Sequence, residues 1–183
     1  MPILGTVASQ FSGKPFSSFE SIQTATVDST SQATITFSSI PSTYKHLQLR
    51  MLARNNSTWM RSVIKFNNDS TMSNYNTHGT QGDGSGAAAF YSANQSKAGG
   101  ANQTQGDGGS GVSVIDILDY TDTNKYKVVR ALFGFEANGS GQVQTASILW
   151  RNTDSVNTIS ITDESGNNFT QYSHFALYGI KGA

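Results

Sequence analysis

The sequence predicts an all-β protein, an antiparallel β-sandwich of the jelly-roll type with an extended N-terminal arm. Short runs rich in β-branched and aromatic residues recur along the chain, and many of them alternate apolar with polar residues. Glycine- and asparagine-rich segments separate these runs. Nine or ten runs at such spacing are typical of a sandwich or jelly roll, and no amphipathic helical segment of useful length interrupts them.

Composition narrows the class of protein further. Sixty-nine of the 183 residues are Ser, Thr, Asn or Gln, and 18 are Gly, which indicates a folded scaffold with neutral polar loops. Twelve basic residues balance twelve acidic ones, so no long-range field favours a nucleic-acid partner. The absence of cysteine excludes disulfides and thiolate chemistry. No apolar run approaches the roughly 18 residues of a membrane span, so we expect a soluble protein without membrane contact.

Residues 1–23 differ from the rest because their apolar residues follow neither a helical nor a strand period. We interpret this segment as an extended arm that precedes a single sandwich domain at 24–183. The arm covers either the domain's own sheet or a neighbouring subunit, and the sequence leaves both alternatives open. Its candidate partner-binding residues are Ile3, Leu4, Val7, Phe11, Phe16 and Phe19.

The first strands of the domain are predicted from alternation. Ile35 and Phe37 alternate with threonines, and the run 46–54 places Leu47, Leu49, Met51 and Ala53 on one face. The run 59–66 follows after a short polar segment, and we interpret it as the hairpin partner of 46–54.

Residues 67–111 form a long polar region in which the pattern almost disappears. A structureless loop of this length is unusual in a compact domain, so at least one short strand is expected near 87–93. Regular structure resumes at 112–118, where apolar residues break strict alternation and predict a strand that is buried on both faces or bulged. Further strands are predicted at 126–135, 143–150, 156–162 and 175–180.

Two Gly-Asp-Gly motifs, centred on Asp83 and Asp107, lie within the polar region. We interpret them as turns, because Gly supplies positive φ and Asp bonds its own backbone two residues on. Calcium is the alternative, but two carboxylates are few for an ion that takes 6 to 8 oxygens. The Gly106-x-Gly108-x-x-Gly111 pattern leads into a strand rather than a helix, which argues against a dinucleotide site.

Residues able to carry catalysis are sparse. The histidines, His46, His78 and His174, are too far apart in sequence to form a zinc motif, and the Gly-x-Ser-x-Gly elbow is absent. Asp116 interrupts an apolar run, so we expect a structural role, either as an ion pair with Arg50 or Arg130 or as a hydrogen-bonded acid. A catalytic acid is the alternative. No catalytic, cofactor-binding or metal-ligating residue is assigned.

Aromatic residues near the polar segments offer one further interpretation. A row of exposed rings provides a platform for a sugar, although core packing is the more usual role of aromatic residues. The four candidates are Trp59, Tyr75, Phe90 and Tyr91.

Three stretches, at 37–50, 114–127 and 171–181, together resemble a family of small virion structural proteins of tailed bacteriophages, particularly phages of aquatic bacteria and cyanobacteria. They read FSSIPSTYKHLQLR, VIDILDYTDTNKYK and QYSHFALYGIK. Ile3-Leu4-Gly5 with Ala8-Ser9, and Phe19-Glu20-Ser21-Ile22, are also similar to the beginning of that family. The resemblance covers most of the chain and is weakest at about 74–109.

The resemblance implies a non-enzymatic component of the virion without a cofactor. We expect a decoration or cement protein on the capsid surface, in contact with the major capsid protein and with copies of itself, with a trimer favoured. The arm at 1–23 supplies the contacts in that case. The alternative is a tail or fibre component that binds the host surface through 67–111. A carbohydrate-binding module and an unrecognised enzyme also remain open.

Overall fold

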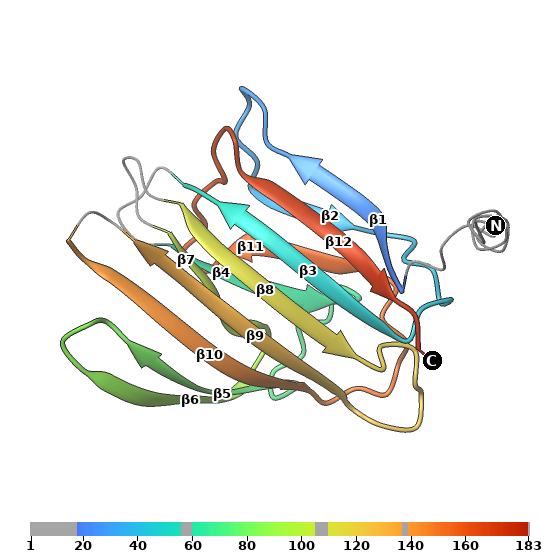
Figure 1. The fold of residues 1–183 in the computed structure, drawn as a ribbon. Coiled ribbons are helices and arrows are strands. Elements are labelled where there is room, and N and C mark those ends of the chain that lie inside the picture. Colours follow the sequence, from blue (N-terminus) through green and yellow to red (C-terminus); the bar gives the residue numbers. More distant parts are fainter. Residues whose placement is uncertain (1–17, 56–59, 105–109, 137–138, 183) are drawn as a thin grey trace, which may run out of the picture.

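The computed structural model describes residues 18–55, 60–104, 110–136 and 139–182, which form strands and no helix (Figure 1). The strands are β1 (Phe19–Thr26), β2 (Thr34–Phe37), β3 (His46–Ala53), β4 (Met60–Phe66), β5 (Tyr75–Gly82), β6 (Ala87–Gln95), β7 (Ala98–Thr104), β8 (Gly111–Leu118), β9 (Lys127–Glu136), β10 (Gly141–Trp150), β11 (Ile159–Asp163) and β12 (His174–Ile180).

Two antiparallel sheets make up the fold. The larger has eight strands in the order β1-β12-β3-β8-β9-β10-β5-β6, and the smaller has four in the order β2-β11-β4-β7. Eight of the strands form two four-stranded sets, β1-β12-β3-β8 and β2-β11-β4-β7, and the chain changes sheet between successive members except from β4 to β7. This is the double-sheet arrangement of a jelly roll. The predicted all-β sandwich is therefore confirmed.

The remaining four strands extend one side of this jelly roll. The hairpins β5–β6 and β9–β10 are inserted after β4 and after β8, and both add to the larger sheet. They meet where β10 pairs with β5 over eight consecutive residue pairs, from Val143↔Gly82 to Trp150↔Tyr75. The larger sheet therefore projects beyond the jelly-roll strands and ends in β6 as its edge.

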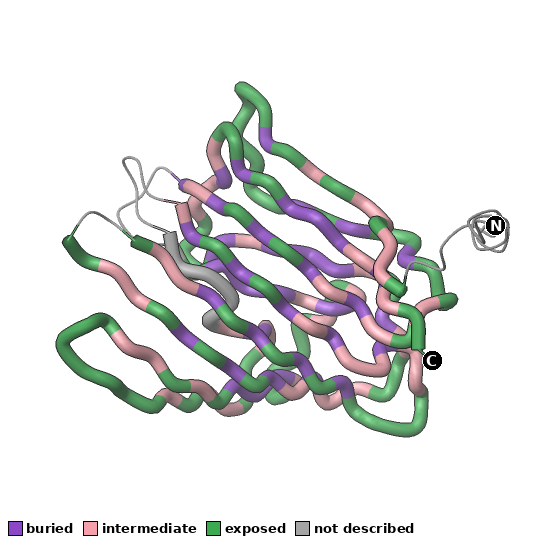
Figure 2. The backbone as a smooth tube through the Cα atoms, in the orientation of Figure 1, coloured by how far each residue is buried: buried purple, intermediate pink, exposed green. Residues whose placement is uncertain are grey.

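The core lies between the sheets and is formed by the alternate residues that the strands turn inward (Figure 2). On β3 the inward residues include Leu47 and Leu49, both fully buried, as the alternation of 46–54 predicts. A cluster of buried rings, Phe66, Tyr75 and Trp150, joins β4 to the inserted strands β5 and β10. This cluster fixes the extension to the jelly roll.

The prediction that 59–66 is the hairpin partner of 46–54 is wrong. β3 lies between β12 and β8 in the larger sheet, and β4 lies between β11 and β7 in the smaller one. The connection crosses from one sheet to the other, as a jelly roll requires. Local alternation in each run identifies a strand but does not identify its neighbour.

The boundary between arm and domain also differs from the prediction. β1 begins at Phe19 and pairs with β12 from Phe19↔Ile180 to Thr26↔His174, so the last residues of the segment 1–23 belong to the sheet. Their apolar pattern is irregular because the register shifts between Ser21 and Gln23. The predicted contact residues Ile3, Leu4, Val7, Phe11 and Phe16 lie outside the described residues.

The polar region at 67–111 contains three strands, of which β6 confirms the strand expected near 87–93, whereas β5 and β7 were not predicted. β5, β6 and β7 are paired through their backbones with β10, with β5 and with β4 respectively. Their side chains are mostly small or polar because β6 and much of β5 are exposed. Because backbone hydrogen bonds hold these strands, their side chains need not alternate between apolar and polar, and the sequence shows no apolar period.

β8 is the strand predicted at 112–118, but its burial and its pairing differ from the prediction. Its residues alternate between buried and more exposed positions, and it pairs without a register shift with both β3 and β9. It is therefore neither buried on both faces nor bulged. The apolar residues that break the expected alternation, Val112 and Val114, point to the exposed side of the sheet.

Candidate interaction face

The side of the larger sheet that is turned away from the smaller sheet is called the outer face here, and Figure 1 looks onto it. An antiparallel sheet with one face on the core usually presents polar residues on the other. Because the strands are in register, side chains of the outer face form transverse rows. Exposed apolar side chains gather in two of these rows, the second of which also contains Arg50, Thr145 and Thr80, and a third row is polar.

The exposed apolar side chains of the first two rows form a contiguous patch across four strands. Leu52 lies opposite Val112, and Val114 lies opposite Leu132. Val112 is 54% exposed, Leu132 is 51% exposed and Val143 is 55% exposed, which is far more than core packing produces. A grouped, exposed set of large apolar side chains marks an interaction surface. The apolar patch consists of Leu52, Val112, Val114, Leu132 and Val143.

The polar row crosses the middle of the same face. Asp116 lies opposite both Gln48 and Arg130, Ser147 lies opposite both Arg130 and His78, and His78 lies opposite Tyr91. Adjacent strands are about 4.8 Å apart, so this row spans about 24 Å. The polar row consists of Gln48, Asp116, Arg130, Ser147, His78 and Tyr91.

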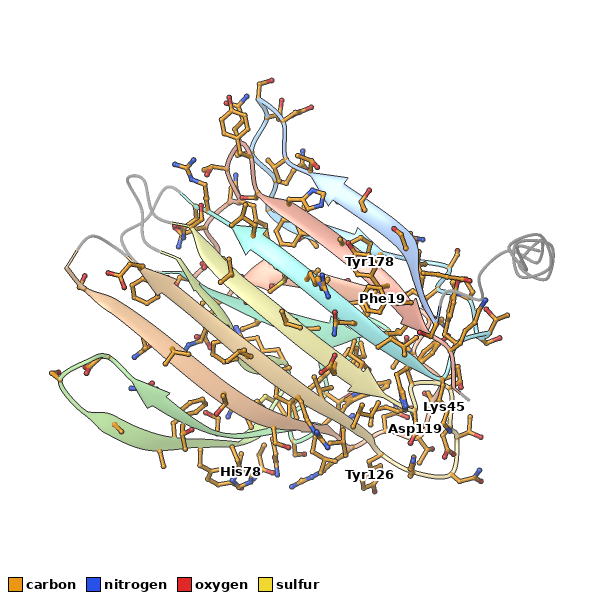
Figure 3. All side chains as sticks on the ribbon, viewed as in Figure 1. Phe19, Lys45, His78, Asp119, Tyr126 and Tyr178 are labelled. Atoms are coloured by element: carbon orange, nitrogen blue, oxygen red, sulfur yellow. The ribbon has the colours of Figure 1, made fainter. Side chains whose placement is uncertain are left out.

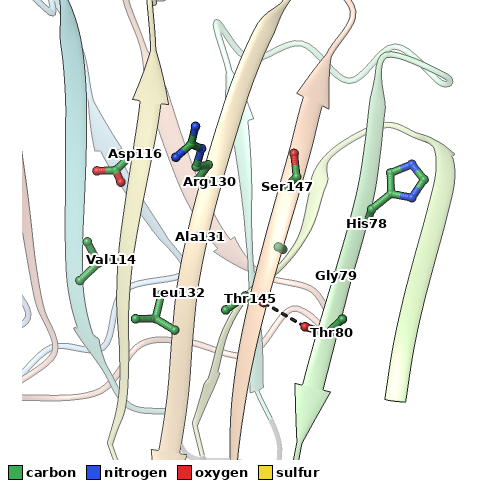
Figure 4. A pocket seen from close by; sticks show the side chains of 11 residues that line it. His78, Gly79, Thr80, Val114, Asp116, Arg130, Ala131, Leu132, Thr145 and Ser147 are labelled. Atoms are coloured by element: carbon green, nitrogen blue, oxygen red, sulfur yellow. Dashed lines mark hydrogen bonds between the residues drawn. The ribbon is translucent and has the colours of Figure 1, made fainter. Parts of the chain in front are cut away.

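An open groove of roughly 730 Å³ joins the polar row to the apolar patch. Val114 and Leu132 line it beside Asp116 and Arg130, as Figure 4 shows. Its other residues come from β5 and β10 and include Thr80 and Thr145, whose hydroxyls hydrogen-bond to each other at 3.0 Å. The groove therefore offers apolar surface and hydrogen-bonding groups side by side, which is the usual composition of a protein-binding surface.

Of the two structural roles predicted for Asp116, the hydrogen-bonded acid is present and the ion pair is not formed. Gln48 Nε2 donates to Asp116 Oδ1 at 2.8 Å, and Arg50 Nε donates to Gln48 Oε1 at 2.8 Å, so an amide bridges the two charges. Among the described residues, Asp116 has no ion pair with Arg50 or with Arg130. The reason is that Asp116 is only partly buried on an open face, where water satisfies a carboxylate without a paired charge.

Aromatic rings stand near both ends of the polar row. His78 stacks on Tyr91 with ring centroids 4.3 Å apart, and Tyr91 is 58% exposed. At the β1 side, Phe19 stacks on Tyr178 at 4.7 Å, and the Arg50 guanidinium lies 5.2 Å from the Phe19 ring (Figure 3). The predicted contact residue Phe19 is thus held within the sheet by its neighbours.

Of the other three aromatic candidates for the sugar platform, the structure describes Tyr75 and Phe90. Tyr75 is fully buried, and its hydroxyl accepts a hydrogen bond from the Phe66 amide at 3.0 Å. Phe90 packs against the core. Trp59 lies outside the described residues. Of the predicted sugar platform, Tyr91 alone is shown as an exposed ring.

A charged cluster fixes the corner where β8 ends. Lys45 and Lys125 both form ion pairs with Asp119, and His46 Nδ1 accepts a hydrogen bond from the Asp119 amide (Figure 3). The Lys125 ammonium, followed by the Lys45 ammonium, lowers the pKa of the Asp119 carboxyl to about 2. Asp119 is therefore charged at neutral pH and neutralised in place, which suits a structural clamp rather than an acid catalyst.

Lys127 is a buried charge that no pattern in the sequence predicted. Its Nζ donates to the backbone carbonyls of Asp122, Lys125 and Thr153 at 2.6, 3.1 and 3.0 Å. Burial lowers its pKa below the ordinary value. All three bonds go to loop carbonyls, so Lys127 holds two connections together and has no donor left for a substrate.

Asp69 plays a similar part at the β4–β5 connection. Its Oδ2 accepts from Trp150 Nε1 and from Asn74 Nδ2, both at 2.7 Å, and its Oδ1 accepts from the Thr71 amide at 2.8 Å. Burial on its own raises the pKa of Asp69, but the bonds from Asn74, Trp150 and Thr71 outweigh it and bring the pKa to about 2. The Asp69 carboxylate therefore satisfies the indole N–H of Trp150, the largest fully buried side chain among the described residues.

The first Gly-Asp-Gly motif forms the predicted turn. Asp83 Oδ1 accepts hydrogen bonds from the amides of Ser85 and Gly86, both at 2.9 Å, and Gly84 has a φ of 86°. The second motif, at Asp107, lies outside the described residues. Within the described ranges no group of three or more His, Asp or Glu side chains is placed to hold a metal ion. The same ranges contain no helix long and apolar enough to cross a membrane.

Comparisons with known proteins leave the family open. No protein-family model matches this chain, and no curated protein matches its sequence. The crystal structure of galectin LEC-6 from Caenorhabditis elegans is similar over 90% of this chain and 99% of its own, with 13% identity and a TM-score of 0.28. A putative pore-forming toxin from Bacteroides vulgatus is similar over 84% of this chain and 60% of its own, with 9% identity and a TM-score of 0.08. Scores this low give no basis for transferring a function.

Proposed function

We propose that this protein is a non-enzymatic structural component of a tailed-phage virion, a decoration or cement protein that docks on the capsid through its outer face. The single observation that carries the proposal is the exposed apolar patch. Catalysis has no support in the polar groups of this face, because the carboxylate and the amide in it are bonded to each other. The resemblance of the sequence to phage virion proteins supplies the identity of the particle.

The size of the patch suits this role. Complete burial of a Val or Leu side chain is worth about 1.5–3 kcal/mol, so the half that is still exposed contributes about 1 kcal/mol for each residue. Five such residues give about 5 kcal/mol before the cost of association is subtracted. A single contact of this strength is weak. Many copies on one shell, or an oligomer that docks by several faces, make the binding tight through effective concentration.

The partners in this proposal are the major capsid protein and other copies of the chain, and the location is the capsid surface. A homotrimer on a symmetry axis is the arrangement that the resemblance favours. The arm residues Ile3, Leu4, Val7, Phe11 and Phe16 remain candidates for a second contact. Deletion of residues 1–17, which leaves β1 intact, tests that contact separately from the patch: reduced occupancy on capsids supports it, and unchanged occupancy removes it.

The patch is tested by adding purified protein back to particles that lack it. Leu132→Asp places a charge in the centre of the patch and is expected to lower particle occupancy at least tenfold, which corresponds to about 1.4 kcal/mol. Thr36→Asp is the matched control, because Thr36 is an exposed strand residue of the smaller sheet. Occupancy that is equal for the two variants, with both folded, would reject docking through this face.

A tail or fibre component that binds the host surface is the second candidate. The observation that favours it is the exposed Tyr91–His78 stack at the end of the polar row, since a ring face packs against sugar C–H groups while polar groups bond hydroxyls. His78 also lines the groove, together with Ser147 and Arg130. Tyr91→Ala is then expected to abolish binding of the purified protein to host cells. Tyr126→Ala, which removes another exposed ring, serves as the control. Unchanged cell binding in both variants removes this candidate.

A further inference from the structure

The edge of the larger sheet formed by β6 is the most open pairing site in the described part of the chain. There β6 is hydrogen-bonded to β5 on one side and has no strand on the other. Its unpaired backbone groups form a template for another strand. From Ala87 to Ser92 the pairing with β5 follows a regular register, apart from a shift between Tyr75 and Thr77 near the far end of the strand.

The sequence of β6 lacks two of the devices that usually protect an edge strand, charged residues and proline. Its nine residues, AAAFYSANQ, contain no charged residue and no proline. Charges, prolines and bulges are the common means by which edge strands avoid pairing. The Ala87–Ala89 segment is exposed, and its methyl groups leave room for the side chains of an added strand.

The opposite edge, β1, is protected in comparison. Glu20 forms an ion pair with Lys181, which places two charged groups at that edge. The register of β1 against β12 also shifts between Ser21 and Gln23. Because the β5–β6 pairing has a register shift as well, the difference between the two edges is the pair of charged groups at β1, which opposes the addition of a strand there.

We propose that β6 pairs antiparallel with β6 of a second copy of this chain, and that the two larger sheets become one continuous sheet across a two-fold axis. A second copy fits because an antiparallel pair of identical strands is self-complementary, so one patch satisfies both partners. An uncharged edge brings no repulsion between like copies. The contact is isologous and closes at two subunits, which differs from the trimer that the resemblance favours.

The geometry of this pair has a consequence for docking. The two-fold axis of antiparallel neighbours in a sheet is perpendicular to the sheet, so the outer faces of both copies are directed to the same side. The two apolar patches then meet one surface together, and the dimer binds with a higher effective concentration than a monomer. This consequence rests on the proposed function, whereas the pairing of β6 does not depend on it.

The test is the mass of the full-length protein in solution, measured by sedimentation over the micromolar range and above. The wild type is expected to show twice the chain mass of 19.6 kDa. Ala89→Lys places like charges across the shared edge and is expected to give a monomer, as is Ala88→Pro. Thr24→Lys is the matched control on β1, and this variant is expected to remain dimeric.

A mixing experiment separates loss of pairing from loss of fold. Ala89→Lys and Ala89→Glu are expected to be monomeric alone and to form a dimer with each other. A wild type that is monomeric throughout, a mass of three chains, or a dimer that persists in both Ala89→Lys and Ala88→Pro would overturn the proposal. Particle occupancy is measured on the same variants: a monomeric Ala89→Lys that still docks through the patch retains the proposed function while confirming the pairing.

Discussion

At the scale of single residues, the carboxylates of this chain act as clamps rather than as reagents. Asp69, Asp83 and Asp119 each accept several hydrogen bonds or ion pairs at a connection between strands. Carboxylates that receive several donors are held in the charged form, and they fix loops by satisfying amides that would otherwise face the core. The acidic side chains therefore contribute to the rigidity of the sandwich.

Removal of the Asp69 carboxylate is expected to destabilise the fold. In Asp69→Ala the buried Trp150 indole loses its acceptor, and an unsatisfied buried donor costs about 1–3 kcal/mol. Chemical denaturation measures the loss. Asp28→Ala is the control, since the Asp28 carboxylate accepts a hydrogen bond from the Thr30 amide in an exposed turn. Equal stability of the two variants would show that the indole is satisfied by water.

The pH dependence of stability follows from the same groups. The pKa values of Asp69 and Asp119 are about 2 in the folded protein, below the value of about 3.9 for an unfolded aspartate. Lowered pKa values stabilise the fold above pH ~4, and this contribution is lost as the pH falls through the folded value near 2. The melting temperature is expected to decrease over that interval, and less so in Asp119→Asn. A decrease at neutral pH instead would contradict this assignment.

At the scale of elements, the inserted hairpin β5–β6 depends on one close approach. A Cβ built on Gly79 meets Phe90 Cζ at 2.3 Å and the Thr145 carbonyl oxygen at 2.6 Å, so the Phe90 ring occupies the space of a side chain. Phe90 packs against the core from this position. The hairpin is therefore attached by a glycine on one strand and a ring on the next.

Gly79→Ala is expected to detach this hairpin partly. The added methyl group displaces either the Phe90 ring or the β10 backbone, and overpacking of this kind costs about 1–3 kcal/mol. Hydrogen exchange of the β5 and β6 amides is expected to accelerate more than exchange in β3. Gly86→Ala is the control from the same hairpin, because a Cβ there has no neighbour within 4 Å. Exchange unaffected by Gly79→Ala would contradict the account.

The strands also show which elements a sequence pattern can predict. The strands β3, β9, β10 and β12 were predictable because their inward residues are apolar and alternate. β5 and β7 were not, since backbone pairing holds them and their side chains leave no period, and β6 was expected only because a structureless loop of that length is unusual. β8 was predicted as buried on both faces because apolar residues on its outward side imitate a core strand. The same residues are the best evidence for an interaction face, and sequence alone does not separate those two meanings.

At the scale of the whole molecule, a jelly roll is extended on one side into a broad sheet with a specialised outer face. The smaller sheet and the jelly-roll strands supply the core, and the inserted hairpins widen the surface that carries the groove. Folds of this kind serve many functions, so the functional argument depends on the face and not on the architecture. The exposed apolar patch next to a polar row is its distinguishing feature.

Docking through the outer face is tested most directly by the accessibility of single cysteines on the particle, because the chain has no cysteine of its own. Val114→Cys places a thiol in the apolar patch, and Thr36→Cys places one on the smaller sheet. Both thiols are expected to react with a maleimide in the free protein. On the particle, the account predicts that the thiol at position 114 is protected while the thiol at position 36 still reacts. Equal labelling of both positions on the particle would contradict it.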